Sequence, residues 1–381
     1  MSDAKRILEY AQKETVNYLT TLKGAVELES LTYGDKATVD KCGEYFQKLF
    51  KGIGFEITVL PQTGCGDHFI GEYGAGKEAV LIVGHYDTVF PIGTLKTMPW
   101  KIEDGKVYGP GALDMKGGIV LAYYAIKCLQ ELGIPINKKI KVFLNSDEEA
   151  GSITSSKPIM EEARKCNYVL VPEPGTAEPG HVKHSRFGRA VYRIYTHGKS
   201  SHSGGAPKAA ISAITELAYL VQALNAMTNH DKGLTVSPTY ITAGIDSTAM
   251  IPGEGCVTVD VRSATKEGMD RVTKVIESLK PTVEGMRLEI TGGVEKPIFE
   301  FNAVNKPLFA KAQEAGKDFG LEVTGHISGG GSDANFTSSI GTPTLDGLGI
   351  TGYLHHNPGE HAIIEHIPYR MALLSRLIQI L

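Results

Sequence analysis

The spacing of hydrophobic residues changes character twice along the chain. Residues 4–50 repeat apolar positions at helical spacing, which predicts two opening helices. Beyond them, short runs suited to strands alternate with helical patterns. The expected elements are strands over 56–60, 68–72 and 79–83, a helix over 117–132, a strand over 139–144, a helix over 152–164 and a strand over 168–171. This alternation predicts an α/β domain with a mostly parallel sheet.

Between residues 184 and 294 the pattern becomes two successive units built of strands and one helix each. The expected elements there are a strand over 190–197, a helix over 209–227, paired strands over 243–251 and 255–263, a helix over 266–279 and a strand over 287–291. Helical spacing returns over 308–319 and 369–381. We therefore predict an inserted α+β domain over 184–294, with 1–183 and 295–381 forming one discontinuous domain.

Composition narrows the classes of function. The chain has 381 residues, 42% of them hydrophobic, which is enough to bury a sizeable core. A formal net charge of −4 and basic clusters no longer than dipeptides argue against a nucleic-acid partner. No apolar run is long enough for a membrane helix, and a charged amino terminus argues against a secretory signal, so we expect a cytoplasmic protein.

Five cysteines, an odd number without a C-x-x-C pair, predict neither a disulfide framework nor a thiolate zinc site. Buried thiols in a reducing compartment are the expected form. Cys65, between two glycines, is a candidate reactive thiol, although the sequence offers it no obvious base.

Acidic and histidine residues follow several predicted strands. They are His85 and Asp87, Asp114 in a glycine-rich turn, Asp147, Glu148 and Glu149, and Glu173. Taken singly, Asp114 fits a helix N-cap and the glutamates fit solvated acids at a helix start. In an open α/β sheet, however, strand ends share one edge, and several carboxylates there repel one another unless protons or cations compensate. We therefore predict a metal site.

The donor set of imidazole nitrogen and carboxylate oxygen, with one further histidine, suits two zinc ions, with cobalt or manganese as alternatives. Within the pair His85 and Asp87, the histidine can bind metal while the aspartate holds its ring. A further ligand is expected from the carboxyl-terminal part, where His355 and His356 are both candidates.

The ordered motifs G-H-Y-D-T-V, G-P-G-A-L-D-M-K-G-G, N-S-D-E-E-A-G-S, V-P-E-P-G, S-H-S-G-G-A-P, D-V-R and G-G-G-S-D-A-N-F run from residue 84 to residue 336. Together they resemble the dizinc hydrolase family of glutamate carboxypeptidase, aminoacylase, acetylornithine deacetylase and peptidase T. Within this family, the motif sequences are most similar to those of glutamate carboxypeptidase. The resemblance implies a phosphorylase/hydrolase-like catalytic domain and a ferredoxin-like inserted lid that also forms a homodimer.

The resemblance also assigns roles within the metal site. It implies that His85 and Glu173 bind one Zn²⁺, that Glu149 and His356 bind the other, and that Asp114 bridges the two. Asp87 would orient His85, and Glu148 would be the general base. His356 is preferred to His355 because the family's last ligand commonly precedes a glutamate by four residues, as His356 precedes Glu360.

In the lid, the resemblance assigns His202 to the oxyanion, reached across the dimer, and Arg262 to a substrate carboxylate. As an isolated strand residue, Arg262 fits a structural salt bridge equally well. The loop containing Gly330 and Ser332 would lie beside the substrate. Residues 249–252 read A-M-I-P, whereas many relatives have an asparagine before the proline turn. Of all the properties that the resemblance implies, substrate preference is therefore the one least supported for this chain.

The sequence thus predicts a dizinc metallohydrolase that cleaves a peptide or N-acyl amino acid and releases a free amino acid. A glutamate carboxypeptidase-like exopeptidase is the first expectation. The alternatives are a tripeptide aminopeptidase and an N-acyl amino acid deacylase. A binding protein that merely retains the fold is a third class, but such a protein would be expected to have lost Glu148 or several ligands, and none is lost.

Overall fold

The computed structural model describes residues 2–245 and 247–381, which divide into two compact units. The first comprises the described residues of Met1–Ser185, together with Phe301–Ser328 and Ser332–Leu381. The second comprises Arg186–Glu300 and Gly329–Gly331. The inserted domain predicted from sequence spans 184–294, so the compact unit begins two residues later and ends six residues later than predicted.

A six-stranded sheet forms the centre of the first unit, with strand order β1-β2-β6-β3-β7-β16. Its strands are β1 Glu56–Leu60, β2 His68–Tyr73, β3 Ala79–His85, β6 Lys139–Asn145, β7 Tyr168–Leu170 and β16 Thr344–Leu345. β3 pairs in parallel with β6 and β7, and β7 with β16, whereas β1 and β2 add an antiparallel edge. The predicted mostly parallel α/β sheet is confirmed.

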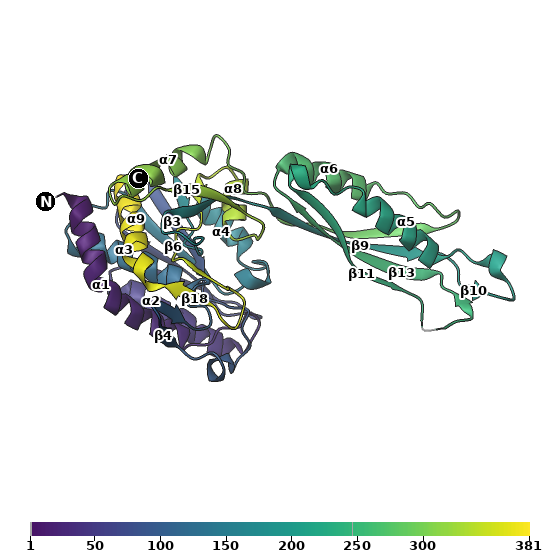
Figure 1. Ribbon diagram of the computed structural model, residues 1–381, viewed down its shortest axis with the longest axis horizontal. Coiled ribbons are helices and arrows are strands. Elements are labelled where there is room, and N and C mark those ends of the chain that lie inside the picture. The colour runs from purple at the N-terminus through teal and green to yellow at the C-terminus, as the bar shows by residue number, and fades with distance from the viewer. Residues whose placement is uncertain (1, 246) are drawn as a thin grey trace. The chain divides into compact units, whose positions relative to one another are not determined.

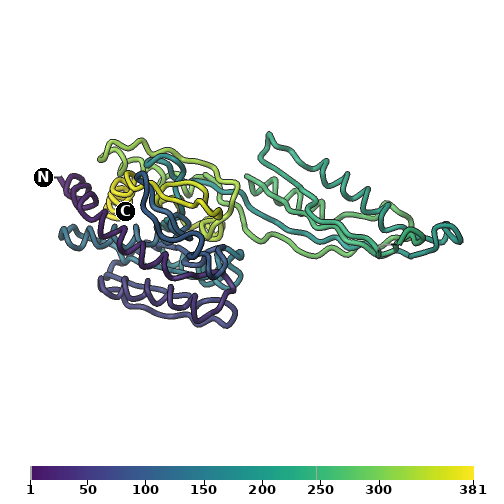
Figure 2. The backbone as a smooth tube through the Cα atoms, turned by 60° about the horizontal axis from the view of Figure 1, so that its bottom comes forward, coloured from purple at the N-terminus to yellow at the C-terminus, as the bar shows by residue number. Residues whose placement is uncertain are grey.

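Helices cover both faces of this sheet, which explains why the central strand is a continuous apolar run. All seven residues of β3 are buried, and the strand contacts both α3 and α4. The helices are α1 Asp3–Val26, α2 Lys36–Gly52, α3 Lys116–Glu131, α4 Ser156–Ala163, α7 Lys306–Lys317, α8 Ala334–Ser339 and α9 Ile367–Ile380. α1 and α9, from opposite ends of the chain, lie side by side and both pack on α3 (Figures 1 and 2).

Two small sheets complete the first unit and were not predicted. One has the order β17-β18-β5-β4, with β4 Lys101–Glu103, β5 Lys106–Tyr108, β17 Gly352–Tyr353 and β18 His361–Ile363. The other pairs β8 His181–Arg186 with β15 Thr324–Ser328. Most of these strands are only two or three residues long and so carry too few alternating positions to be recognised in sequence.

The second unit is a four-stranded antiparallel sheet with two helices on one face (Figure 1). In chain order it contains β9 Gly188–His197, α5 Ala213–Asn225, β11 Leu234–Ala243, β13 Glu254–Ser263, α6 Lys266–Glu277 and β14 Arg287–Lys296. The sheet order is β11-β13-β9-β14. This is the predicted ferredoxin-like arrangement, in which the first strand lies between the third and the fourth. A short pair, β10 Ser201–His202 with β12 Met250–Ile251, extends from it.

One strand prediction in this unit was wrong. The partner of β13 is β11 at 234–243, whereas the sequence had suggested 243–251, a range that includes Asp246 and so lies partly outside the described residues. Pro238 interrupts β11 at a shift of register, which is tolerated because β11 is an edge strand. Proline and an exposed second half hid its alternating pattern.

Helix α5 also begins later than predicted, at Ala213, because the side chain of Ser212 caps it by accepting from the Thr215 amide at 3.2 Å. Among the helices of the described residues, none is long and apolar enough to cross a membrane.

The buried aromatic residues of α2 anchor the first unit. Phe46 is fully buried and packs against Tyr86. Tyr86 directly follows the predicted ligand His85 in sequence. We expect Phe46→Ala to lower the free energy of unfolding of this unit by about 3–5 kcal/mol, because it removes apolar contacts and leaves a cavity. Urea denaturation measures the change. The control Val16→Ala, at a side chain that is 71% exposed, should change it by less than about 0.5 kcal/mol, and an equally small effect of Phe46→Ala would contradict the packing described here.

Candidate metal centre

Three neighbouring parallel strands deliver the predicted site residues to one edge of the sheet. His85 is the last residue of β3 and is in register with Asn145, the last residue of β6. Glu148 lies in the one-turn 3-10 helix η2 (Glu148–Ala150) that follows β6, and Glu173 lies three residues beyond the end of β7. Asp114 comes from the turn directly before α3. The tertiary fold thus collects residues that are far apart in sequence.

Two groups of potential ligands share the carboxylate of Asp114. In the first, His85 Nε2 is 3.4 Å from Asp114 Oδ1 and 3.3 Å from Glu173 Oε1. In the second, His356 Nε2 is 3.3 Å from Asp114 Oδ2 and 3.1 Å from Glu149 Oε1. Each oxygen of Asp114 therefore belongs to a different group.

The separations within each group fit a bound ion. Ligands at the usual zinc distances in a tetrahedron are about 3.3 Å apart. Moreover, Asp114 Oδ1 and Glu149 Oε1 are buried and accept no hydrogen bond. Buried carboxylate oxygens without a hydrogen-bond donor are costly unless a cation compensates their charge. The residues present thus fit a dinuclear centre with nitrogen and oxygen ligands.

The electrostatics of the protein alone point the same way. Burial, reinforced by the charge of Asp114, raises the pKa of Glu149 to about 8. Contacts with Asp114 and Glu149 raise the pKa of His356 to about 10. Burial opposes a charge on His85, yet Asp114, Asp87 and Glu173 hold its pKa well above the usual value. Protons on the imidazoles balance the crowded carboxylates, and divalent cations can replace those protons.

The orientation of His85 is set through its other ring nitrogen. Nδ1 lies 3.1 Å from the backbone carbonyl oxygen of Asp87 and 3.3 Å from its Oδ1. In the neutral form that binds metal, donation from Nδ1 to the carbonyl leaves the Nε2 lone pair for an ion held together with Asp114 and Glu173. Both the backbone and the carboxylate of Asp87 therefore face this ring.

The carboxylate of Asp87 also positions the second ligand group. Its Oδ2 accepts a hydrogen bond from Thr32 Oγ1 at 2.5 Å and one from the backbone amide of Glu149 at 3.1 Å. Asp87 is fully buried. A single carboxylate thus contacts His85 of one group and fixes Glu149 of the other.

Glu148 belongs to neither ligand group. Its Oε2 is 4.0 Å from His85 Nε2, and the side chain is nearly buried. Glu148 and Glu149 are adjacent in sequence but differ in surroundings, because the turn of η2 directs only Glu149 to His356. The carboxylate of Glu148 therefore lies next to the candidate metal ligands without being one of them.

The two histidines that the sequence left as alternatives are separated by the structure. His356 reaches Asp114 and Glu149, whereas His355 is in neither of the ligand groups found among the described residues. The loop places Leu354 and His356 in left-handed backbone conformations, with φ of 62° and 63°. Such conformations are uncommon away from glycine and often accompany functional sites.

Comparison with known proteins identifies the family. Residues 81–380 match the model of peptidase family M20/M25/M40. The chain belongs to this family. Members of this family hydrolyse amide bonds, so the chain is an enzyme. The alternative of a binding protein that only retains the fold is therefore wrong.

Individual relatives span nearly the whole chain of this M20/M25/M40 peptidase. Carboxypeptidase G2 of Pseudomonas sp. (strain RS-16) is 32% identical over 98% of this chain and 91% of its own length. Among solved structures, aminopeptidase PepT of Bacillus cereus matches with a TM-score of 0.79 and 23% identity, over 97% of this chain and 98% of that chain. A dinuclear metal-binding peptidase of Bacillus subtilis matches with a TM-score of 0.69 and 15% identity, over 97% of this chain and 98% of that chain.

A residue of the peptidase that the sequence reasoning did not assign to the site is Glu360. Its Oε1 accepts hydrogen bonds from the backbone amides of Leu113 at 2.8 Å and Asp114 at 3.2 Å. It is fully buried and burial raises its pKa to about 8. Glu360 therefore holds the turn that presents Asp114. Its fixed distance of four residues from His356 was the available sequence signal.

Asp333, from the glycine-rich loop, was also missed. Its Oδ2 accepts from Asn145 Nδ2 and its Oδ1 from Ser152 Oγ, both at 2.6 Å. These two donors stand at either end of the segment that contains Glu148 and Glu149. Asp333 thus ties this segment of the peptidase to the loop 329–333.

Ser332, predicted to bind substrate, is fully buried in the first unit. Its hydroxyl donates to Asp346 Oδ2 at 2.6 Å and accepts from the Ala334 amide at 3.1 Å. Gly330 belongs to the second unit, where its carbonyl accepts from Arg186 Nη1 at 3.2 Å. Substrate binding by this loop stays a prediction, with the Ser332 hydroxyl already used inside the protein.

His202 and Arg262 also lie in the second unit. The exposed ring of His202 accepts at Nδ1 from the amides of Gly204 and Gly205, at 3.1 and 3.0 Å. Arg262 donates from Nε to Asp260 Oδ1 at 2.8 Å. The first contact leaves the proton of a neutral ring on Nε2, and the second leaves the terminal nitrogens of the guanidinium as donors.

Replacement of Asp87 tests the arrangement of ligands. We expect Asp87→Asn to weaken binding of the metal by about 10- to 100-fold, because the amide no longer attracts the proton on His85 Nδ1 and changes the contact to the Glu149 amide. Competition with a chromophoric chelator measures the affinity. Asp231→Asn, at an exposed position, is the control and should have no effect. Equal affinities for wild type and Asp87→Asn would exclude this role.

Proposed function

We propose that this peptidase is a dizinc exopeptidase of the glutamate carboxypeptidase type, which cleaves the amide that joins an acyl group to a carboxyl-terminal amino acid. Cobalt or manganese would suit the same ligands. The proposal assigns His85 and Glu173 to one ion, Glu149 and His356 to the other, and Asp114 to both. The predicted cytoplasmic location stays a prediction.

The observation that carries the proposal is the division of Asp114 between two imidazoles. Its oxygens are 3.4 Å from His85 Nε2 and 3.3 Å from His356 Nε2. A carboxylate shared in this way supports two neighbouring ions, and the likeness to a protein described as a dinuclear metal-binding peptidase supports the same assignment. Zinc ions bound here would supply Lewis acidity, polarising the amide carbonyl and making water acidic enough to ionise near neutral pH.

Glu148 is the proposed general base. Its Oε2 lies 4.0 Å from His85 Nε2, beside the first ligand group, where it could reach a water bound by the ions. It takes a proton from the water that attacks the carbonyl carbon. When the carbon–nitrogen bond breaks, Glu148 returns this proton to the nitrogen of the leaving amino acid. Near-complete burial keeps the carboxylate from being solvated by bulk water.

Recognition of the substrate is assigned to the second unit. Asp260 fixes Arg262 through Nε, which presents the two terminal nitrogens as a planar fork suited to a carboxylate. The second oxygen of Asp260 accepts from Arg189 Nε at 2.7 Å and so fixes the aspartate in turn. The likeness to carboxypeptidase G2, at 32% identity, favours a substrate with a free carboxylate.

His202 is proposed to stabilise the oxyanion from a partner subunit. With Nδ1 occupied by two backbone donors, the neutral ring has its proton on Nε2, which is the form needed to donate to a developing negative charge. The exposed position of the residue is compatible with contact to another molecule.

Exposed apolar side chains support a homodimer formed through the second unit. They lie on helix α5 and on edge strand β11: Ile214, Tyr219, Tyr240 and Ile241 are 55%, 48%, 61% and 54% exposed. An edge strand flanked by exposed apolar residues favours association. Pairing of this surface between two copies would cover both.

Glu148→Gln tests the base. We expect kcat to fall by about 10²- to 10⁴-fold, because an amide cannot take the proton from water. Hydrolysis of an N-acyl glutamate and the zinc content should be measured on the same preparation. Zinc should stay at two ions per chain, since Glu148 is not a ligand. The control Glu161→Gln, at an exposed position, should keep full activity, and undiminished kcat in Glu148→Gln would remove the residue from this role.

Arg262→Ala tests the class of substrate. For an acylated amino acid with a free carboxylate we expect kcat/KM to fall by about 10- to 100-fold, the cost of a charged hydrogen-bonded pair of about 1.5–3 kcal/mol. The amide of the same substrate, which lacks the charge, should be hydrolysed equally by both enzymes. Arg271→Ala, at an exposed position of α6, is the control. Preference for tripeptides with a free amine, unaffected by Arg262→Ala, would favour the aminopeptidase alternative.

A further inference from the structure

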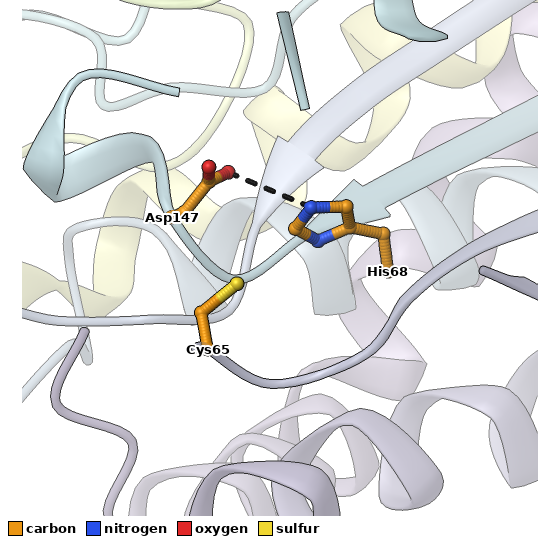
Figure 3. A group of neighbouring side chains, drawn as sticks. All are labelled: Cys65, His68 and Asp147. Atoms are coloured by element: carbon orange, nitrogen blue, oxygen red, sulfur yellow. Dashed lines mark ion pairs between the residues drawn. The ribbon is translucent and has the colours of Figure 1, made fainter. Parts of the chain in front are cut away.

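A second cluster of buried polar residues lies behind the segment that contains Glu148. The cluster consists of Cys65, His68 and Asp147, each of which is at most 1% exposed. Their side chains point toward one another (Figure 3). His68 Nε2 is 3.8 Å from Asp147 Oδ1, an oxygen that accepts no hydrogen bond. Neither the proposed ligands nor the proposed base include these residues.

Hydrogen bonds define the protonation of His68. The backbone amide of Ser146 donates to Nδ1 at 3.3 Å, which makes this nitrogen an acceptor. An acceptor Nδ1 puts the ring proton on Nε2, and burial, which lowers the pKa of His68, favours this neutral form. Nε2 then donates to Thr154 Oγ1 at 2.8 Å. The ring thus connects the backbone after β6 to a threonine eight residues further along.

Thr154 completes the connection to Asp147. Having accepted from His68, its hydroxyl donates to Asp147 Oδ2 at 2.9 Å, and its backbone amide donates to the same oxygen at 2.6 Å. The carbonyl of Asp147 accepts from the Ser152 amide at 2.8 Å. One chain of hydrogen bonds therefore runs from Ser146 through His68 and Thr154 to Asp147.

These hydrogen bonds argue against a third metal ion at the cluster, although its donors are suited to zinc. A metal on Nε2 requires the ring proton on Nδ1, where it would face the Ser146 amide proton. Burial also raises the pKa of the Cys65 thiol and so disfavours the thiolate that a metal would bind. The cluster is occupied by its own hydrogen bonds.

Asp147 is joined by a peptide bond to Glu148, whereas ligand Glu149 has a separate anchor in Asp87. Rotation about the backbone of Asp147 moves Glu148 first. A general base that moves by about 1 Å can lose up to about 100-fold in rate. The position of the carboxylate of Glu148 therefore depends on how firmly Asp147 is held.

We propose that His68 and Thr154 are positioning residues for Glu148, acting through the side chain of Asp147. This inference rests on the proposed role of Glu148 as base. The hydroxyl of Thr154 is the link between them, because it accepts from His68 and donates to Asp147.

The test compares Thr154→Val, which keeps the shape but lacks the hydroxyl, with Thr154→Ser, which keeps it. Thr154 is otherwise exposed, so neither change disturbs the core. We expect Thr154→Val to lower kcat for N-acyl glutamate by about 10- to 100-fold, with KM unchanged and two zinc ions retained per chain. Thr154→Ser should restore kcat to within about twofold. Thr20→Val, at an exposed position of α1, is the control.

A second pair of variants covers the case in which Thr154→Val is poorly folded. His68→Gln keeps a donor for Thr154 and should retain more kcat than His68→Leu, which has none. Full kcat in Thr154→Val, equal losses in the valine and serine variants, or a third zinc ion that is lost in Cys65→Ser would each overturn the proposal. Activity retained in Glu148→Gln would refute the base itself, so the two failures can be told apart.

Discussion

Repulsion among carboxylates at one edge of the sheet is the constraint on which the rest of the structure depends. Asp114, Glu148, Glu149 and Glu173 are nearly buried within a few ångströms of two imidazoles. Such a group is stable only when protons or metal ions compensate its charge. The shared carboxylate of Asp114 divides the group into two sets of ligands. This division underlies the proposed dizinc chemistry.

Hydrogen bonds from backbone amides and from side chains to further carboxylates hold these residues in place. Glu360 accepts from the turn before Asp114, Asp87 from the amide of Glu149, and Asp333 from Asn145 and Ser152. Each acceptor comes from a different part of the chain. The segment containing the ligand and the base is therefore fixed by tertiary contacts, as a site requires when small displacements are costly. Its precision does not derive from local secondary structure.

The residues proposed for recognition and those proposed for catalysis come from different units of this protein. The candidate metal centre is built wholly from the first unit, in which the parallel sheet brings strand ends together. The residues proposed to bind the substrate carboxylate and the oxyanion belong to the second unit. If the proposed roles hold, specificity can change in one unit while the hydrolytic chemistry is kept in the other.

The sequence alone predicted the α/β class and candidate ligands after its strands, because buried parallel strands read as apolar runs and strand ends share one edge. The ferredoxin-like insertion and the division of the ligands between two ions came from the resemblance to the family. Sequence patterns failed for β11, where Pro238 hid the edge strand, and for the strands of the two small sheets. The tertiary structure agrees with the preference for His356 over His355, and only the tertiary structure revealed the contacts of Glu360 and Asp333 and the connection from His68 to Asp147. Those roles depend on hydrogen bonds between residues distant in sequence, and a hydrogen bond leaves no periodic pattern along the chain.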